Sequence, residues 1–314
     1  ACPMSAAAAH VKDTTVYLNR QLKRNNRRRI DQISDKCLLC GKCGSVCPVG
    51  VEGDKLRIAY RSNRKYSLTP DYSIIDESRY IVPEKRRLLY FAGCMTDLTP
   101  SIKKSMLTIL NAVGEDYRLM DEDGGICCGR PMLMAGRKDA AEQMIRKNTD
   151  IIKASGASVL LVSCPICYRI FKEKYELEGI EVLHHTEYID RIVSDGMITM
   201  THTGRKYVYH DPCELGRGTG IYDEPRRVLS LLGTLVEAGK NGKESICCGG
   251  SVGSLSLGFD KRKALTENAL ANLTVASPEV IVTACPLCKS TFGRYAASPV
   301  MDIAEVIAKS TVIQ

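Results

Sequence analysis

Cysteine is the residue type in this chain that is best placed to carry a chemical function, and the cysteine positions form a repeating pattern. Ten of the fifteen cysteines form one five-cysteine pattern that occurs twice. The two copies are Cys94, Cys127, Cys128, Cys164 and Cys167, and then Cys213, Cys247, Cys248, Cys285 and Cys288. Corresponding positions lie 119 to 121 residues apart. So regular a spacing over five positions indicates a duplicated unit with cysteine at its functional centre.

A third group of cysteines precedes both copies. Its members are Cys37, Cys40, Cys43 and Cys47, with Pro48 next, which is the spacing of a bacterial ferredoxin cluster-binding run. The glycines at 41 and 44 allow the backbone to wrap closely around a cluster and to point N–H groups at its sulfurs. Thiolates are soft ligands that suit iron. The sequence therefore predicts iron–sulfur chemistry, with a four-iron cubane on this run.

Cys2, followed by Pro3, offers a second way to complete that cubane. In two-cluster ferredoxin domains the fourth cysteine, which precedes a proline, ligates the other cluster. On this interpretation Cys2 joins Cys37, Cys40 and Cys43, and Cys47 serves part of a second cubane. The simpler interpretation, which we favour from the sequence, keeps all four ligands within the run.

Disulfides and structural zinc are the competing explanations for so many cysteines. Disulfides belong to small secreted domains with little core, whereas this chain is 44% hydrophobic and shows no signal-peptide pattern. Adjacent cysteines such as Cys127 and Cys128 are also poorly placed to bond to each other. Zinc sites use four ligands and usually two Cys-x-x-Cys turns. Each repeat has five cysteines and one such turn, which favours iron and sulfide over zinc.

The charge balance gives a weaker indication. The formal net charge is +8, and basic residues cluster before the ferredoxin run at Arg20, Lys23, Arg24, Arg27, Arg28 and Arg29. Without interleaved aromatics or a reader motif, this run does not predict nucleic-acid binding. It is either a solvated helix face or a docking surface for an acidic redox partner. No apolar run approaches the roughly 20 residues that span a bilayer. We therefore expect a cytoplasmic chain, with contact to a membrane subunit at the inner face as the alternative.

The elements that must position the cysteines follow one plan in each repeat. A buried strand over 88–91 delivers Cys94, a helix opens at Thr99-Pro100 and closes at Gly114, and a strand follows near 117–120. A helix with an apolar face over 141–152 then leads to a strand over 158–162 that ends near Cys164. The second copy repeats this with strands over 207–209 and 280–283 and helices over about 223–232 and 260–274. Alternation of this kind predicts an α/β fold with parallel sheets, whose ligands gather at the carboxyl ends of the strands.

Four segments are expected along the chain. Residues 1–60 form a small, mainly helical ferredoxin-type domain, and residues 61–85, with two prolines, form a linker. The two repeats occupy 86–200 and 201–314, and a tandem duplication allows them to be related by a pseudo-twofold axis.

The local strings around the cysteines resemble those of the cysteine-rich CCG domain family. They are Ile126-Cys-Cys-Gly-Arg-Pro131, Ile246-Cys-Cys-Gly-Gly250, Tyr209-His-Asp-Pro-Cys213 and the two Cys-Pro-x-Cys turns. With the ferredoxin run in front, the chain looks like a fused subunit of the heterodisulfide-reductase type. The resemblance implies a noncubane four-iron cluster on the five cysteines of each repeat, and reduction of a small disulfide substrate between the two clusters.

The same family also includes iron–sulfur subunits of glycolate, lactate and anaerobic glycerol-3-phosphate oxidising systems. The alternative function is therefore a relay that passes electrons from a flavoprotein toward a quinone or another carrier. No Gly-x-Gly-x-x-Gly follows a strand, so electrons must come from another redox subunit, a flavoprotein or a ferredoxin-like donor.

One position departs from the family pattern. Glu214 follows Cys213 where family members often have His, which puts a proton-donor role there in doubt. We interpret the preceding His210 and Asp211 as structural, with Asp211 accepting hydrogen bonds from turn amides.

Overall fold

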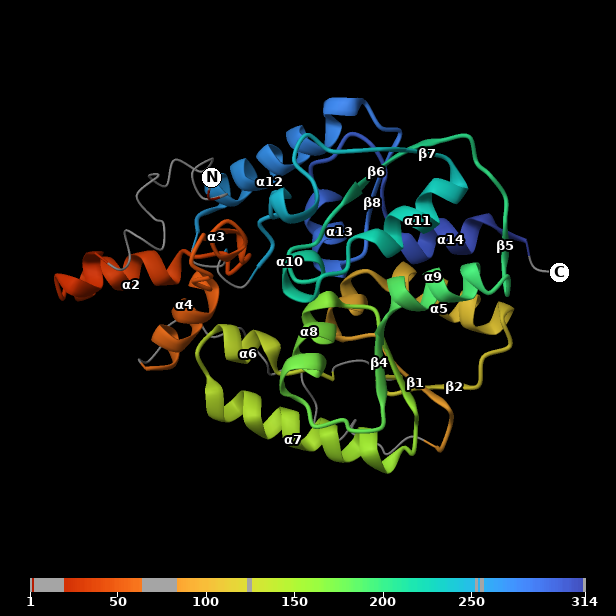
Figure 1. Ribbon diagram of the computed structural model, residues 1–314, viewed down its shortest axis with the longest axis horizontal. Helices are drawn as coiled ribbons and strands as arrows, with labels where there is room; N and C mark the ends of the chain where they lie inside the picture. The colour runs from red at the N-terminus through yellow and green to blue at the C-terminus, as the bar shows by residue number, and fades with distance from the viewer. Residues whose placement is uncertain are drawn as a thin grey trace.

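The computed structural model describes residue 2 and residues 20–63, 84–122, 126–251, 254 and 257–312. Over these residues the chain forms a mixed α/β structure, with a helical N-terminal part beside two similar α/β units (Figure 1). None of the described helices is long and apolar enough to serve as a membrane span.

The first α/β unit contains a four-stranded parallel sheet with strand order β2-β1-β3-β4. Its strands are β1 (Leu88–Phe91), β2 (Tyr117–Leu119), β3 (Val159–Val162) and β4 (Glu181–His184). All four residues of β1 and of β3 are buried. Such continuous apolar strands are typical of a parallel sheet that is covered on both faces.

The second unit repeats this sheet, with strand order β7-β6-β8-β9 and every pair parallel. Its strands are β6 (Lys206–His210), β7 (Thr234–Val236), β8 (Val280–Thr283) and β9 (Val300–Asp302). The two sheets therefore have the same topology, as a duplication requires.

The helices also correspond between the two units. The first unit has α5 (Pro100–Ala112), α6 (Arg130–Met134), α7 (Lys138–Ala154), α8 (Pro165–Lys174) and α9 (His185–Ser194), with the short 3₁₀ helix η3 (Cys94–Leu98). The second has α10 (Gly216–Thr219), α11 (Asp223–Leu232), α12 (Phe259–Leu273), α13 (Pro286–Phe292) and α14 (Ile303–Ser310), with η4 (Gly242–Glu244) and η6 (Thr274–Ala276).

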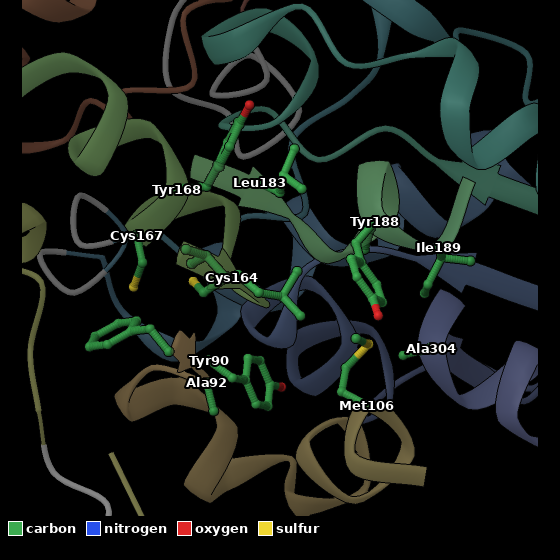
Figure 2. Packing of buried hydrophobic residues seen from close by; sticks show 14 of the residues in the cluster. Tyr90, Ala92, Met106, Cys164, Cys167, Tyr168, Leu183, Tyr188, Ile189 and Ala304 are labelled. Carbon is green, nitrogen blue, oxygen red and sulfur yellow. The ribbon is translucent and has the colours of Figure 1, made fainter. Parts of the chain in front are cut away.

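The two units pack through equivalent helices. α5 of the first unit contacts α14 of the second, and α9 of the first contacts α11 of the second. Figure 2 shows Met106 of α5, Ala304 of α14 and both Tyr188 and Ile189 of α9 within one buried cluster. The short strands β5 (Thr199–Met200) and β10 (Thr311–Val312) add an antiparallel pair between the units. One hydrophobic core thus extends through both units and holds them in a fixed relation.

The N-terminal part consists of α2 (Arg27–Asp35), α3 (Lys42–Ser45) and α4 (Gly53–Ser62) and lies at one side of both units (Figure 1). Arg61 attaches it to the first unit, because its fully buried guanidinium donates to the carbonyl oxygens of Ser34 and Met134 over 3.1 and 2.8 Å. Gly136 makes room for this contact: its φ is +83°, and a Cβ there would lie 2.5 Å from the Arg61 carbonyl carbon.

Most of the expected elements are confirmed. The strands β1 and β8 and the helix α11 have the predicted bounds, and α5 and α7 lie where the capping and apolar patterns placed them. The strands β4, β7 and β9 and the helices α8, α9, α13 and α14 were not predicted from the sequence. The linker expected over 61–85 lies mostly outside the described residues, and α4 continues to Ser62.

Candidate functional site

The cysteines of the first repeat lie at the carboxyl ends of its central strands. Cys94 begins η3 shortly after β1, Cys164 is the N-cap of α8 just after β3, and Cys167 lies in the first turn of α8. Cys127 and Cys128 come from the loop that leads into α6. A parallel sheet collects ligands at this edge, so the chain topology brings all five sulfurs to one place.

The five sulfurs of the first repeat form a continuous series of contacts. Cys94 contacts Cys127, Cys127 contacts Cys128, Cys128 contacts Cys167, and Cys167 contacts Cys164. Burial alone would raise the pKa of Cys128, but the contacts with Cys127 and Cys167 outweigh it and lower the pKa to about 6. The contact with Cys128 in turn raises the pKa of Cys127 to about 12. Neighbouring thiols thus stabilise a thiolate here, which is the form that binds metal.

The second repeat has the same series in the same order. The sulfurs of Cys213 and Cys247 are 4.0 Å apart, and those of Cys248 and Cys288 are 3.3 Å apart. Cys247 also contacts Cys248, and Cys288 contacts Cys285. Contact with Cys247 is the main reason that the pKa of Cys248 lies well below its ordinary value. Each predicted five-cysteine set is therefore brought together by the fold.

A glycine after each cysteine pair makes this geometry possible. Gly129 and Gly249 have φ of +82° and +88°, a region that favours glycine. The N–H groups of Gly129 and Gly250 donate to the sulfurs of Cys127 and Cys248, in each case over 3.4 Å. These amides offset negative charge on sulfur in the way that iron–sulfur sites require.

The two sets approach each other across the interface between the repeats. The contact with Cys288 lowers the pKa of Cys285, but burial and then the charge of Cys164 of the first set act the other way, and the pKa of Cys285 is raised. The two Cys-Pro-x-Cys turns are thus the neighbouring parts of the two sets.

The ferredoxin run lies against the second repeat. The Cys40 sulfur contacts that of Cys247, and this contact is the main cause that lowers the pKa of Cys40 to about 6, with a further contribution from Arg217. Arg217 donates through Nε to the carbonyl oxygen of Cys40 over 2.7 Å and through Nη1 to the Ser245 hydroxyl over 2.8 Å. The Lys42 ammonium, on α3, pairs with the Glu244 carboxylate at 3.2 Å.

Cys2 and Cys47 differ in their surroundings. Cys2 is half-buried and packs, together with Cys40 and Cys213, against the apolar cluster that contains Leu38 and Cys247. Cys2 also acts electrostatically with Cys37 and Cys43 on the buried Arg57, whose pKa is raised despite burial.

The Cys47 sulfur instead accepts from the Val51 N–H over 3.3 Å, and in the described part of the chain no contact joins it to another cysteine. Its neighbours Val46 and Val49 are 57% and 79% exposed. This arrangement favours Cys2 over Cys47 as the companion of Cys37, Cys40 and Cys43, and so favours the interpretation that the sequence alone ranked second.

A buried ionic network joins the three parts of the chain. Oε2 of Glu214 lies 3.0 Å from Arg130 and 3.1 Å from Arg169, and all three side chains are at most 8% exposed. Glu173 pairs with Arg169 at 2.8 Å, and Asp54 of α4 approaches Arg169 at 3.9 Å. Because its carboxylate accepts from two guanidinium groups, Glu214 acts as a buried anion that links the repeats.

Asp211 makes two kinds of contact, of which only acceptance from a backbone N–H was expected from the sequence. It binds Arg226 through both oxygens, at 2.7 and 2.9 Å, and its Oδ2 accepts from the Gly242 N–H over 2.7 Å. His210 is buried and packs edge-on against Phe292.

The donor sets fit iron–sulfur clusters. Each set offers buried thiols in mutual contact, with thiolate character and backbone N–H donors. Among the described residues, no group of three or more His, Cys, Asp or Glu side chains is arranged to bind a single metal ion.

Several residues beside the cysteines were not anticipated from the sequence. Arg57, Arg217, Arg130 and Arg169 are charged, and three of them lie within four positions of a predicted ligand. That proximity was a usable signal, but their burial and partners depend on contacts between distant segments.

Comparison with known proteins gives the family. The model of the family described as "CCG: Cysteine-rich domain" matches residues 88–172 and 207–293. A subunit of dihydromethanophenazine:CoB–CoM heterodisulfide reductase from Methanosarcina acetivorans is 28% identical over 314 residues, covering 86% of this chain and 75% of the relative.

Two further relatives are longer proteins. A fumarate reductase (CoM/CoB) subunit from Methanothermobacter marburgensis is 28% identical, with 81% of this chain and 55% of the relative covered. EtfAB:quinone oxidoreductase from Syntrophomonas wolfei is 30% identical, with 71% of this chain and 34% of the relative covered. This chain thus spans about half of the one and a third of the other. Since the family model matches more than half of the chain, in two copies, the chain belongs to the CCG cysteine-rich domain family.

Proposed function

We propose that this chain is a heterodisulfide-reductase-like iron–sulfur subunit of a multi-subunit complex, in which electrons enter through a cubane and reach two noncubane clusters that reduce a small disulfide. One observation carries the proposal. Two five-cysteine sets have the same order of sulfur contacts and face each other through Cys164 and Cys285, while Cys40 lies against the second set. A redox role is common to the names of these relatives; the specific reaction is our proposal.

The ligands in this proposal are the cysteines that the fold groups together. One noncubane cluster is held by Cys94, Cys127, Cys128, Cys164 and Cys167, and the other by Cys213, Cys247, Cys248, Cys285 and Cys288. Cys37, Cys40, Cys43 and Cys2 hold the cubane, and Cys47 is left for part of a second cubane. The clusters supply the electron transfer, and the chain supplies thiolates, amide donors and burial.

The contacts of the ferredoxin run define an order of electron transfer. Cys40 contacts Cys247 of the second repeat, so a cluster held by the ferredoxin run would lie nearer to the second five-cysteine set than to the first, and electrons would reach the second set first. Arg217 positions the two loops for this step, because it donates to groups on both.

The electron donor in this proposal is another redox subunit, a flavoprotein or a ferredoxin-like protein. The basic side chains Arg24, Arg27 and Arg28 are exposed and form a positive surface at the start of α2. A surface of this charge favours encounter with an acidic donor.

A non-catalytic relay is the second candidate, and one observation favours it. A relative that is 30% identical is named an EtfAB:quinone oxidoreductase. In that case the same clusters only pass electrons from a flavoprotein to a quinone, and the chain sits in the cytoplasm against a membrane subunit.

Electron paramagnetic resonance of anaerobically purified protein separates the two candidates. A cluster signal that changes when a thiol or a disulfide is added supports disulfide reduction. A cluster signal that does not change when a thiol is added, together with rapid reduction by a flavoprotein, supports the relay. If the purified protein contained zinc and no acid-labile sulfide, both candidate functions would be excluded.

A further inference from the structure

A buried imidazole and a buried carboxylate meet at the interface between the two repeats. His185 is the first residue of α9 and Asp302 is the N-cap of α14, and both side chains are fully buried. Nε2 of His185 lies 3.0 Å from Oδ1 of Asp302. Burying two ionisable groups is costly, and apolar residues would close this interface at least as well. Stability alone therefore does not explain why this pair is buried at the interface, whereas a functional role would.

The hydrogen-bond pattern shows at which atom of the pair a proton can be gained or lost. Oδ1 of Asp302 also accepts from the Ala304 N–H over 2.9 Å, at a helix N-terminus that favours negative charge. We therefore assign an ionised Asp302 and a proton on Nε2 of His185. Nδ1 of His185 has no hydrogen-bond partner among the described residues. With Nδ1 protonated the pair is neutral, and without that proton it carries one buried negative charge.

The histidine next to it does not compete for this proton. Nδ1 of His184 accepts from the Thr186 N–H over 3.3 Å, so its proton is on Nε2. Burial, and then the neighbouring His185, hold the pKa of His184 well below its ordinary value. The rings of His184 and His185 lie 4.3 Å apart. His184 therefore stays neutral beside His185.

The other titratable groups around the pair either stay neutral or are already paired. Tyr90 of β1 and Tyr209 of β6 are buried phenols, and burial raises the pKa of both well above the ordinary range. Burial also raises the pKa of Glu187, whose carboxylate accepts from the His184 N–H.

On the side of α14, Glu305 accepts from the Asp302 N–H over 2.7 Å and pairs with Lys289 at 2.6 Å. The side chains of Glu305 and Lys289 are 11% and 15% exposed, so this pair leads from Asp302 toward solvent. His185 is thus the buried group that can gain or lose a proton when the charge on a nearby group changes.

The pair lies beside the two strands that lead into the Cys-Pro-x-Cys turns. His184, which precedes His185, is the register partner of Val162, two residues before Cys164. Asp302 is the register partner of Thr283, two residues before Cys285. With strands about 4.8 Å apart and a rise of about 3.3 Å per residue, the pair lies on the order of 10 Å from both turns.

We propose that Nδ1 of His185, held by Asp302, is a proton site that balances the charge of an electron arriving at either cysteine set. The proposal rests on the proposed function, because it needs redox clusters on those sets. The electron comes from a one-electron donor of the ferredoxin type, and one N–H bond forms with a proton from solvent. Oxidation reverses both transfers.

The expected size of this coupling follows from the distance. At about 10 Å and an effective dielectric constant of about 20, one added electron raises the proton affinity of His185 by about tenfold. Linkage is reciprocal, so protonation makes the clusters easier to reduce by the same factor. For a one-electron couple, a tenfold change corresponds to about 59 mV.

Redox titration of the intact, cluster-loaded protein, followed by electron paramagnetic resonance between about pH 5 and 9, tests this proposal. The wild-type midpoint potential of a CCG cluster should fall by about 59 mV in total as the pH rises. In His185→Gln, which keeps a side-chain N–H for Asp302, the potential should not change with pH. Asp302→Asn keeps the helix cap but removes the counter-charge of the imidazolium. In this variant the midpoint potential should therefore fall over a lower pH range than in the wild type. The exposed His202→Gln is the matched control and should behave as the wild type.

Two results would overturn the proposal. The first is a wild-type pH dependence that survives in His185→Gln. The second is a dependence that disappears in His210→Gln and not in His185→Gln, which would assign the proton to His210. Iron and sulfide content and thermal unfolding identify any variant that has not folded. If the wild type itself shows no redox-active cluster, the proposed function fails first.

Discussion

Arg217 of the second repeat donates through Nε to the carbonyl oxygen of Cys40, over 2.7 Å, across 177 positions of sequence. The same guanidinium binds the carbonyl and the hydroxyl of Ser245, two residues before the second cysteine pair. One side chain therefore fixes the distance between the ferredoxin run and Cys247.

Replacing this arginine should loosen that junction. We expect Arg217→Ala to lose about 2 kcal/mol of unfolding free energy, since it removes hydrogen bonds from a buried charged group. Electron transfer from the cubane to the second CCG cluster should slow, with unchanged iron content, in a stopped-flow experiment. Arg205→Ala, at an exposed arginine, is the control. Equal rates in both variants would contradict the role given to Arg217.

The surroundings of Cys2 and Cys47 lead to opposite expectations for two serine variants. Cys2→Ser should remove the cubane signal or convert it to a three-iron form, because Cys2 lies with Cys37 and Cys43 around Arg57. Cys47→Ser should keep that signal. Low-temperature electron paramagnetic resonance and iron analysis make the comparison. Loss of the cubane in Cys47→Ser alone would restore the ligand set that the sequence favoured.

Glu214 accepts hydrogen bonds from two buried guanidinium groups, so its removal should be costly. Glu214→Ala leaves Arg130 and Arg169 short of a partner and should lower the unfolding free energy by about 3–5 kcal/mol. Glu214→Gln keeps an acceptor and should lose less. Glu237→Gln, at a 43% exposed partner of Arg226, should change stability by less than about 1 kcal/mol. Chemical denaturation gives all three values, and a small effect of Glu214→Ala would show that water reaches the network.

Glu173 should give part of the stability a dependence on pH. Burial alone would raise its pKa, but the hydrogen bond from Arg169 and the charges of Arg169 and Arg130 lower it. A depressed carboxyl pKa stabilises the fold above the unfolded value of about 4.3, and the stabilisation disappears as the pH falls through the folded value. The difference in unfolding free energy between wild type and Glu173→Gln should therefore be largest near neutral pH and shrink toward pH 3. The 81% exposed Glu178 supplies the control variant, Glu178→Gln, which should show almost no such trend.

The basic surface at α2 can be tested by charge removal. Neutralising Arg24, Arg27 and Arg28 to Gln should slow reduction by an acidic donor and flatten its dependence on salt. Cluster content should not change. Removing Lys261, Arg262 and Lys263, three exposed charges on α12, is the matched control. If both triple variants are reduced at the same rate, the α2 residues are only a solvated face.

Local patterns predicted the elements whose signals are local. The buried runs of β1 and β8, the proline after Thr99 and the apolar face of α7 depend on neighbouring residues, and each lies where it was expected. The cysteine repeat likewise predicted which sulfurs the fold groups together in each repeat.

The remaining features depend on contacts between distant segments. Cys40 and Cys247 are 207 positions apart, and Glu214 meets Arg130 across 84 positions. No spacing pattern encodes such pairs. The choice between Cys2 and Cys47 as the fourth cubane ligand is of the same kind, because it weighs a regular local run against a remote cysteine.

The interface between the repeats has a consequence for how such a chain arises. Its helix pairs, α5 with α14 and α9 with α11, are the same contact made twice. A single repeat carries both halves of that contact, so two separate copies would associate as a homodimer. A homodimer must place identical residues on the two sides of its axis. Fusion of the copies removes this constraint, so the His185–Asp302 pair can occur once: the corresponding positions hold Ile303 and His184, which form no such pair.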